Sequence, residues 1–257
     1  MHFQLPKPLH GWRAFAGEVG IIVIGVLIAL GAGQIVEWVH WRSEQRDTLE
    51  RLFQESRTNV WLLRRGREVL REDANAEETF ATALTHGGCP PAKQWETVTD
   101  LIKYPQVAAE TSVYDEVVGA GGLADIQSTR ARDAISEFHA KLTWLQNTTE
   151  FFRMKAERPF DLSDPRVTIS LGASPTEPEI IDWDRPALCA DKAFRNRVAI
   201  GARNRMVWTG FHDDVVQSAI GMCAVLAREL GTRCTPVNGP PLTRDEQQIA
   251  AHAAAGR

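Results

Sequence analysis

The chain has no large excess of charge of either sign and no strong compositional bias. Among its 257 residues, 29 are Lys or Arg and 33 are Asp or Glu, which gives a formal net charge of -4. Nucleic-acid-binding proteins usually carry a basic excess, so this balance excludes a general nucleic-acid partner. Glycine and proline occur at ordinary frequencies, which excludes collagen-like and low-complexity chains. The sequence therefore describes a folded protein that is long enough to bury a core.

Motifs of the common metal and nucleophile chemistries are also missing. Neither HExxH nor CxxCH occurs, and no two of the four cysteines form a CxxC pair. The glycine-rich run 119–122 lacks the Lys-Ser/Thr of a phosphate loop. His139 and His212 lie on two predicted helices and could approach one another as metal ligands, but a solvent-facing or hydrogen-bonded histidine is commoner. We therefore expect no catalytic, cofactor-binding or metal-ligating residue, and no enzymatic activity.

One long segment contains no charged residue. It covers 19–36, between Glu18 and Glu37, and as a helix it is about 27 Å long, close to the hydrocarbon thickness of a bilayer. Trp12 precedes it and Trp38 and Trp41 follow it, where amphipathic rings favour the headgroup layer. The pattern predicts a transmembrane helix over 19–36, with a short cytoplasmic tail over 1–18 and these tryptophans as interfacial anchors.

A cleaved signal peptide is the main alternative for this segment. Residues 31–33 have the small side chains of a cleavage site, and Lys7 and Arg13 supply a basic start. However, the apolar stretch is longer than a usual signal core, and the helical pattern continues beyond Trp41. These two features favour an uncleaved anchor in the membrane.

Small residues recur every fourth position within the predicted span. Gly25, Ala29 and Gly33 share one helical face, and such a face lets two membrane helices approach closely. We expect this face to contact the membrane helix of another protein or of a second copy of the chain. The alternative is that Gly and Ala are simply common in membrane helices.

The cysteines all follow the predicted span, at 89, 189, 223 and 234. Lys and Arg are similarly distributed on both sides of the span, so they do not decide its orientation. An even number of cysteines in one compartment is compatible with disulfides in an oxidising environment. We favour the pairs Cys223–Cys234 and Cys89–Cys189 and a periplasmic location for residues 37–240. Four free thiols in a cytosolic domain are the alternative.

Helical periodicity dominates the remaining chain. One segment, from about 14 to 72, contains no proline and predicts a single helix or two nearly collinear ones, followed by a shorter helix over 75–86. A second long helix begins at the N-cap Ser128 and ends before Pro159. A third covers about 191–230, and Arg205 interrupts its apolar seam. Residues 159–189 are expected to form a loop, in which only residues 166–171 alternate like a strand, over too short a stretch to found a sheet, and 241–257 a helical tail.

These elements predict an all-α fold. The transmembrane helix continues into a long helix, which packs with the two further long helices as an antiparallel bundle. Two groups of arginines accompany the first and third helices, and neighbouring acidic residues can neutralise them. We expect both groups to lie on solvated helix faces. Their members are Arg57, Arg64, Arg65, Arg67 and Arg71, then Arg195, Arg197, Arg203 and Arg205.

Two stretches resemble a group of uncharacterised bacterial membrane proteins that share a domain of unknown function. Residues 17–30, GEVGIIVIGVLIAL, followed by Trp38 and a charged helix, are similar to the membrane span of that group. Residues 111–123, TSVYDEVVGAGGL, are similar to its second stretch, a short helix that ends in a glycine turn. The resemblance implies a bacterial origin and a membrane anchor. It implies no catalytic residue, and it includes neither the cysteines nor the segment after Pro159.

The prediction for function is a single-pass protein of the bacterial inner membrane that works without catalysis. It would act as an interaction scaffold or accessory subunit of a membrane complex, with the lipid bilayer and another membrane protein or a second copy as its partners. One alternative is a periplasmic sensor or signal-transmission module that works through a partner protein. An enzyme with an unrecognised site is a further alternative.

Overall fold

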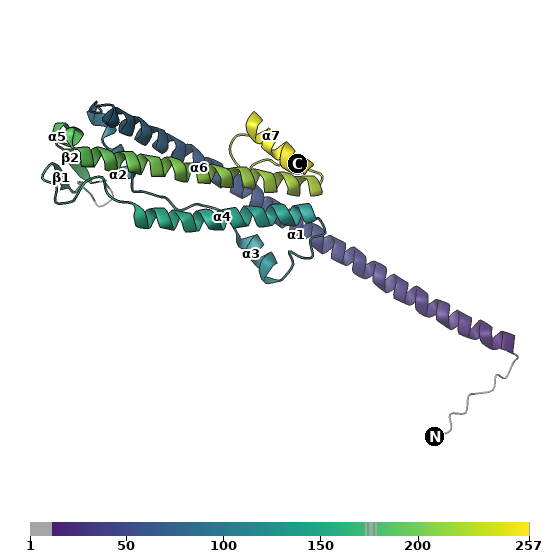
Figure 1. The fold of residues 1–257 in the computed structure, drawn as a ribbon. Coiled ribbons are helices and arrows are strands. Elements are labelled where there is room, and N and C mark those ends of the chain that lie inside the picture. Colours follow the sequence, from purple (N-terminus) through teal and green to yellow (C-terminus); the bar gives the residue numbers. More distant parts are fainter. Residues whose placement is uncertain (1–11, 173, 175–176, 178, 257) are drawn as a thin grey trace, which may run out of the picture. The chain divides into compact units, whose positions relative to one another are not determined.

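The structure, a computed structural model, describes residues 12–172, 174, 177 and 179–256, without the side chains of residues 12–16, 18, 29, 32, 33, 35 and 36. The chain divides into two compact units, Met1–Leu49 and Glu50–Arg257. Its described part is mainly helical and has only two short strands, which confirms the predicted all-α class (Figure 1). The elements are α1 (Trp12–Thr85), the 3-10 helix η1 (Ala92–Gln94), α2 (Thr97–Asp100), α3 (Ser112–Gly119), α4 (Thr129–Lys155), β1 (Val167–Ser170), β2 (Ile180–Trp183), α5 (Arg185–Ala190), α6 (Lys192–Glu229) and α7 (Arg244–Ala255).

Helix α1 does not break where the sequence predicted a second helix to begin. It continues through residues 72–75 and ends at Thr85. Residues 72–75 contain neither proline nor glycine, and Ala74 is buried with only 5% of its surface exposed. Burial of Ala74 in the second unit stabilises the helical conformation, so the polar residues Asp73 and Asn75 do not end it.

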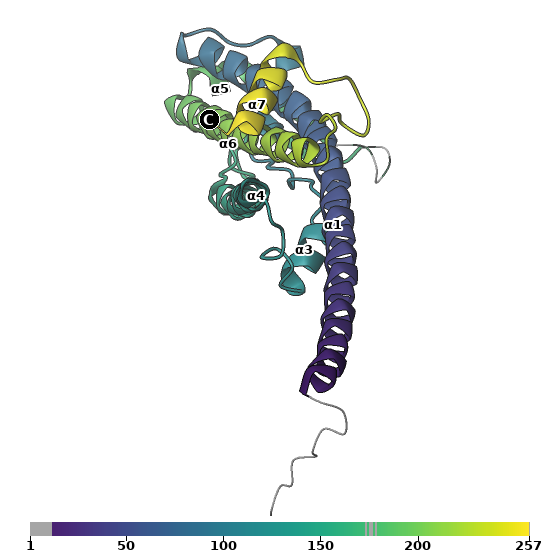
Figure 2. The same ribbon diagram turned by 90° about the vertical axis from the view of Figure 1, so that its right-hand side faces the viewer.

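Helices α4 and α6 pack along each other in the second unit (Figure 1). Three contacts show that they run in opposite directions: Ser128 with Glu229, Trp144 with Phe211, and Thr149 with Trp208. Helix α7 lies against α6 (Figure 2). Side-chain contacts also join α6 to the part of α1 after Glu50, as described below. These contacts support the predicted bundle of three long helices.

Capping residues fix the ends of these helices. Ser128 accepts a hydrogen bond from Ala131 N at 3.2 Å and begins α4, as predicted, and Asp191 begins α6 by accepting one from Ala193 N at 2.7 Å. Helix α6 ends at Glu229, and Gly231 follows with a φ of +69°, the left-handed conformation that glycine adopts readily. The chain then turns back, which brings Cys234 to Cys223.

The predicted loop 159–189 contains two short strands and a helix, and the first strand falls within the strand-like stretch 166–171. Strands β1 and β2 form an antiparallel hairpin in which Val167 pairs with Trp183 and Ser170 with Ile180, and α5 follows directly. The hairpin is short, so its own hydrogen bonds would hold it weakly. Packing explains its presence, because Val167 is buried and Ile181 and Trp183 lie against an apolar cluster.

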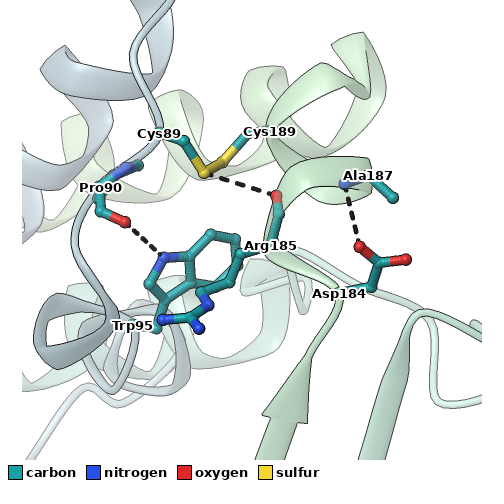
Figure 3. The surroundings of a disulfide bond; sticks show 7 residues. All are labelled: Cys89, Pro90, Trp95, Asp184, Arg185, Ala187 and Cys189. Carbon is teal, nitrogen blue, oxygen red and sulfur yellow. Dashed lines mark hydrogen bonds between the residues drawn. A yellow bond between two sulfur atoms is a disulfide. The ribbon is translucent and has the colours of Figure 1, made fainter.

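That cluster fills one end of the second unit and combines aliphatic residues with four aromatic ones, Phe80, Trp95, Phe160 and Phe194. Trp95 is at its centre: its ring stacks on Phe194 with the ring centroids 5.8 Å apart and meets the edge of Phe80 at 5.4 Å. Its indole N–H donates to the carbonyl of Pro90 at 3.1 Å (Figure 3). The disulfide between Cys89 and Cys189 lies beside this cluster and links the segment after α1 to α5.

The first unit consists, in its described part, of the beginning of α1. Among the residues that the structure describes, no helix is both long enough and apolar enough to cross a membrane. The predicted span 19–36 is therefore not confirmed. Residues 29, 32, 33, 35 and 36 of that span are among those whose side chains lie outside the description.

Candidate functional site

The described apolar side chains at the start of α1 are strongly exposed. Nine aliphatic residues between Val19 and Leu30 have 41–74% of their surface accessible, and they face all sides of the helix. Large exposed apolar patches in folded proteins mark surfaces that bind protein or lipid. Residues 19–30 are therefore the most prominent candidate binding surface in the described part of the first unit. The nine are Val19, Ile21, Ile22, Val23, Ile24, Val26, Leu27, Ile28 and Leu30.

The residues predicted to contact a second membrane helix are only partly described. Gly25 is exposed, and a Cβ placed on it would meet no atom within 4 Å. Ala29 and Gly33 belong to α1, but their side-chain positions lie outside the described residues. Gly25 thus faces open space.

The predicted interfacial tryptophans have different environments. Trp38 is 53% exposed, and the guanidinium of Arg42 lies 5.0 Å from its ring centroid in a cation–π contact. Trp41 is half-buried, and the side chain of Trp12 lies outside the description. Trp38 therefore presents an apolar ring beside a cation, a combination that suits a membrane–water boundary.

Both disulfides occur with the favoured pairing. Cys89 is bonded to Cys189 across 100 residues of sequence, and Cys223 is bonded to Cys234 across 11. Cys223 is fully buried on α6, so the second bond attaches the segment after α6 to the core. No cysteine of the chain is left as a free thiol.

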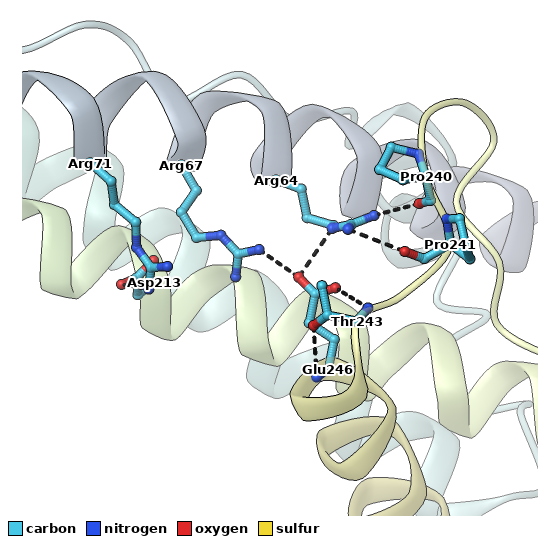
Figure 4. A network of polar contacts seen from close by, with 8 residues as sticks. All are labelled: Arg64, Arg67, Arg71, Asp213, Pro240, Pro241, Thr243 and Glu246. Carbon is cyan, nitrogen blue, oxygen red and sulfur yellow. Dashed lines mark hydrogen bonds and ion pairs between the residues drawn. The ribbon is translucent and has the colours of Figure 1, made fainter.

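Arg64 and Arg67 do not lie on a solvated face as the sequence suggested, whereas Arg71 is exposed; acidic groups of other helices meet all three (Figure 4). Arg64 Nε lies 3.1 Å from Glu246 Oε1 of α7, and Arg67 Nη2 lies 2.5 Å from the same oxygen. Arg71 pairs with Asp213 of α6 at 2.7 Å. Arginines spaced three and four residues apart share one helix face, so these three together fasten α6 and α7 to α1.

Glu246 is the shared acceptor of this network. Its other oxygen accepts the backbone N–H of Thr243, while the Thr243 hydroxyl accepts the N–H of Glu246, so the two residues form a capping box at the start of α7. Burial raises the pKa of Glu246, but the Thr243 N–H and Arg67 outweigh that effect and hold the pKa below its usual value. Glu246 is therefore charged at neutral pH and binds two cations.

Arg205, like Arg64, lies in the core, although the sequence predicted a solvated face for both. Its Nε is 3.2 Å from Glu77 Oε1, and its guanidinium also donates to the carbonyl of Asp100. Tyr104 and Trp208 offer their ring faces to the guanidinium at 4.9 and 5.7 Å. Burial raises the pKa of Glu77 to about 7, although Arg205 opposes this shift. Arg205 interrupts the pattern of apolar residues in the sequence of α6. In the structure its side chain is nevertheless packed inside the core.

Polar side chains of α1 also position α3. Glu55 is buried and accepts the backbone N–H of Val113 at 2.6 Å, which caps the start of α3. Asn59 forms two hydrogen bonds with the backbone of Glu110, as donor at 2.8 Å and as acceptor at 2.6 Å. Burial raises the pKa of Glu55, and the N–H groups only partly offset it. The helix predicted over 111–123 is thus held by side chains of α1.

His139 and His212 have separate surroundings. The His139 ring stacks on Tyr114 with the centroids 3.4 Å apart, whereas His212 lies against Gly66 of α1 and near Trp208. Burial lowers the pKa of each to about 4, so both are neutral at physiological pH. Within the described residues, no group of three or more His, Cys, Asp or Glu side chains is placed to hold a metal ion.

The sequence analysis did not identify the buried polar contacts of Glu246 and of Glu77. For Glu246, however, the sequence contains a recognisable pattern. The spacing Thr243-x-x-Glu246 is that of a capping box and predicts the start of α7. Glu77 and Arg205 are 128 residues apart, and no local pattern connects them. Comparison of the chain with protein-family models, with curated proteins and with solved structures finds no match.

Proposed function

We propose that this chain is a membrane-anchored interaction protein of the bacterial inner membrane. Residues 19–36 cross the bilayer, and residues 50–257 form a disulfide-linked helical domain in the periplasm. The domain binds other proteins and carries out no catalysis. The chain thereby serves as a scaffold or accessory subunit of a membrane complex.

The observation that carries this proposal is the exposure of the aliphatic residues between Val19 and Leu30. Burial of apolar surface contributes about 25 cal/mol per Å². Nine large aliphatic side chains exposed to water on every side of one helix would be strongly unfavourable, and a single partner helix covers only one side. A lipid environment surrounds a helix on all sides, so it accounts for the exposure of Ile21, Ile22 and Ile24 together.

The disulfides support the proposed compartment. Two disulfides that use all four cysteines are typical of oxidising environments such as the periplasm, and are rare in the cytosol.

The buried arginines support a structural role for the second unit. Arg64, Arg67 and Arg205 hold carboxylates of the same chain, so their charges organise the domain instead of a substrate.

Alkaline carbonate washing of membranes tests the anchor. We expect the wild-type chain to stay in the membrane pellet. Replacing Ile24 and Leu27 with Lys places two charges in the middle of the span, each at a cost of about 3 kcal/mol, and should release the chain. The matched control replaces Met154 and Leu171, which are 77% and 87% exposed in the second unit, with Lys. Release of the wild-type chain would contradict the anchor.

The small-residue face of the span is the proposed contact with a partner helix. Replacing Gly25 and Gly33 with Leu should weaken association of the chain in a membrane two-hybrid assay. Gly20 and Gly31 lie together on a different face, and a Cβ on either meets no atom within 4 Å. The double Leu variant at Gly20 and Gly31 is therefore the control. Equal association of the two double variants would contradict the assignment of this face.

A further inference from the structure

A mainly apolar pocket of about 370 Å³ lies in the second unit, between α1, α6 and the segment after α2. Its buried wall consists of Leu70, Val107, Trp208 and His212, each with at most 5% of its surface exposed. Val69 is 55% exposed at the rim. The volume falls within the range of small-molecule sites.

His212 is the unusual member of this wall. The residue is 3% exposed, and neither ring nitrogen has a hydrogen-bond partner among the residues that the structure describes; Nδ1 is fully enclosed, whereas Nε2 lies on the side of the pocket residue Gly66. The other polar group of the buried wall, the Trp208 indole N–H, already donates to Thr149 Oγ1 at 2.9 Å. A buried polar atom without a partner costs about 1–3 kcal/mol, so such atoms are rare unless a ligand or water binds them.

Gly66 leaves room in front of the imidazole. A Cβ at this position would lie 3.4 Å from His212 Nε2 and 3.6 Å from Cε1, so any larger side chain would fill the space between α1 and the ring. Burial keeps the ring neutral by lowering its pKa to about 4. A neutral imidazole has one donor and one acceptor nitrogen, and it therefore suits an uncharged polar group.

We propose that this pocket binds a small apolar molecule with a single hydroxyl group, a phenol or an alcohol, whose hydroxyl hydrogen-bonds to Nε2 of His212. A hydroxyl both donates and accepts, so it satisfies the imidazole in either tautomer. The apolar body of the molecule packs against Leu70, Val107 and Trp208. Binding at this site is separate from the membrane contact proposed above.

A matched pair of probes tests the proposal without any substitution. Isothermal titration calorimetry compares 4-propylphenol with propylbenzene, using the full chain in lipid nanodiscs, or in buffer if the chain is soluble without lipid. Protein-free nanodiscs serve as the blank. We expect saturable binding of 4-propylphenol, about tenfold tighter than that of propylbenzene, because only the phenol supplies the hydrogen bond. Equal affinities, or no saturable binding of the phenol, would overturn the proposal.

Two variants then locate the binding. Gly66→Leu should abolish binding of 4-propylphenol, whereas Gly210→Leu on α6, where a Cβ meets no atom within 4 Å, should leave it unchanged. His212→Phe keeps an aromatic ring but removes the nitrogens, so it should remove the tenfold preference. If Gly66→Leu folds and still binds the phenol with wild-type affinity, the ligand binds elsewhere and the assignment is wrong.

Discussion

Arg205 of α6 and Glu77 of α1 form an ion pair in which at most 1% of either side chain is exposed. Neither residue reaches water, so each charge depends on its partner and on neighbouring groups. The carbonyl of Asp100 and the rings of Tyr104 and Trp208 complete the surroundings of the guanidinium, while Nη1 has no partner among the described residues. The pair therefore joins two long helices through polar contacts inside the core.

Breaking this pair should be strongly destabilising. At pH 8, above the Glu77 pKa of about 7, Arg205→Met leaves Glu77 buried without its counter-charge, so the carboxyl must either stay charged or take up a proton, which typically costs about 3–5 kcal/mol in the free energy of unfolding. Replacing both residues, with Glu77→Leu and Arg205→Met, should cost clearly less than Arg205→Met alone. Urea unfolding followed by circular dichroism measures the free energy of unfolding of the two single variants, Arg205→Met and Glu77→Leu, and of the double variant. Additive losses from the two single substitutions would show that the pair is not coupled.

Glu246 should hold α7 in place. Glu246→Ala removes the acceptor of Arg64 and Arg67 together with half of the capping box, so amide hydrogen exchange in α7 should accelerate at least tenfold. Asp245→Ala is the matched control, because Asp245 is an exposed acidic residue in the same first turn. Similar exchange in the two variants would mean that the arginines do not attach α7.

The buried histidines predict loss of stability in acid. Their pKa is lowered from 6.5 to about 4, so the unfolded chain binds more protons than the folded chain between these values. Each histidine therefore contributes about 3 kcal/mol above pH 6.5, which is lost as the pH falls through 4. Glu77, with a pKa raised to about 7, has the opposite effect: its contribution is present below pH 4.5 and is lost as the pH rises through 7.

One substitution separates these contributions. His139→Phe keeps the ring that stacks on Tyr114 but cannot take up a proton, so the variant should lose about 2–3 kcal/mol less stability than wild type between pH 7.5 and 4.5. Urea unfolding at the two pH values measures the difference. Exposed His252→Phe is the control and should not change it. An unchanged acid loss in His139→Phe would contradict the buried, neutral state of His139.

The two disulfides should differ in the stability they contribute. The Cys89–Cys189 bond closes a loop of 100 residues and should contribute about 5 kcal/mol, whereas Cys223–Cys234 closes a loop of 11 and should contribute about 3 kcal/mol. Paired Ala variants of each disulfide, unfolded in urea without reductant, measure these contributions. A larger loss for the shorter loop would show that loop closure does not set their order.

The sequence predicted the elements whose signals are local. The cap at Ser128, the extent of α6 and the pairing of four cysteines could be derived from side-chain type and spacing. It did not predict that α1 continues through Asp73 and Asn75, because tertiary burial of Ala74 overrides their weak helix preference. The strand-like alternation at 166–171 was recognised, but its pairing with the strand that ends at Trp183 was not, since packing on the apolar cluster holds the hairpin.

The arginines show the same limit at the candidate site. Arg64 and Arg205 have acidic neighbours in sequence, which suggested exposed charge pairs, yet both bind carboxylates from distant segments. Only the fold brings Glu246 to Arg64 and Glu77 to Arg205. The pocket beside His212 likewise depends on the approach of α1 to α6 at Gly66, which no periodicity in either helix reveals.

The most direct test of the proposed function is protease digestion of intact spheroplasts that express the chain with an N-terminal epitope tag. An anchored chain with a periplasmic domain should lose residues 50–257 to the protease and leave a short, tagged fragment in the membrane. Digestion after lysis and a cytosolic marker protein control for leakage. Full protection in intact spheroplasts, with digestion only after lysis, would contradict the periplasmic location, and recovery of the tagged fragment in the soluble fraction would contradict the anchor.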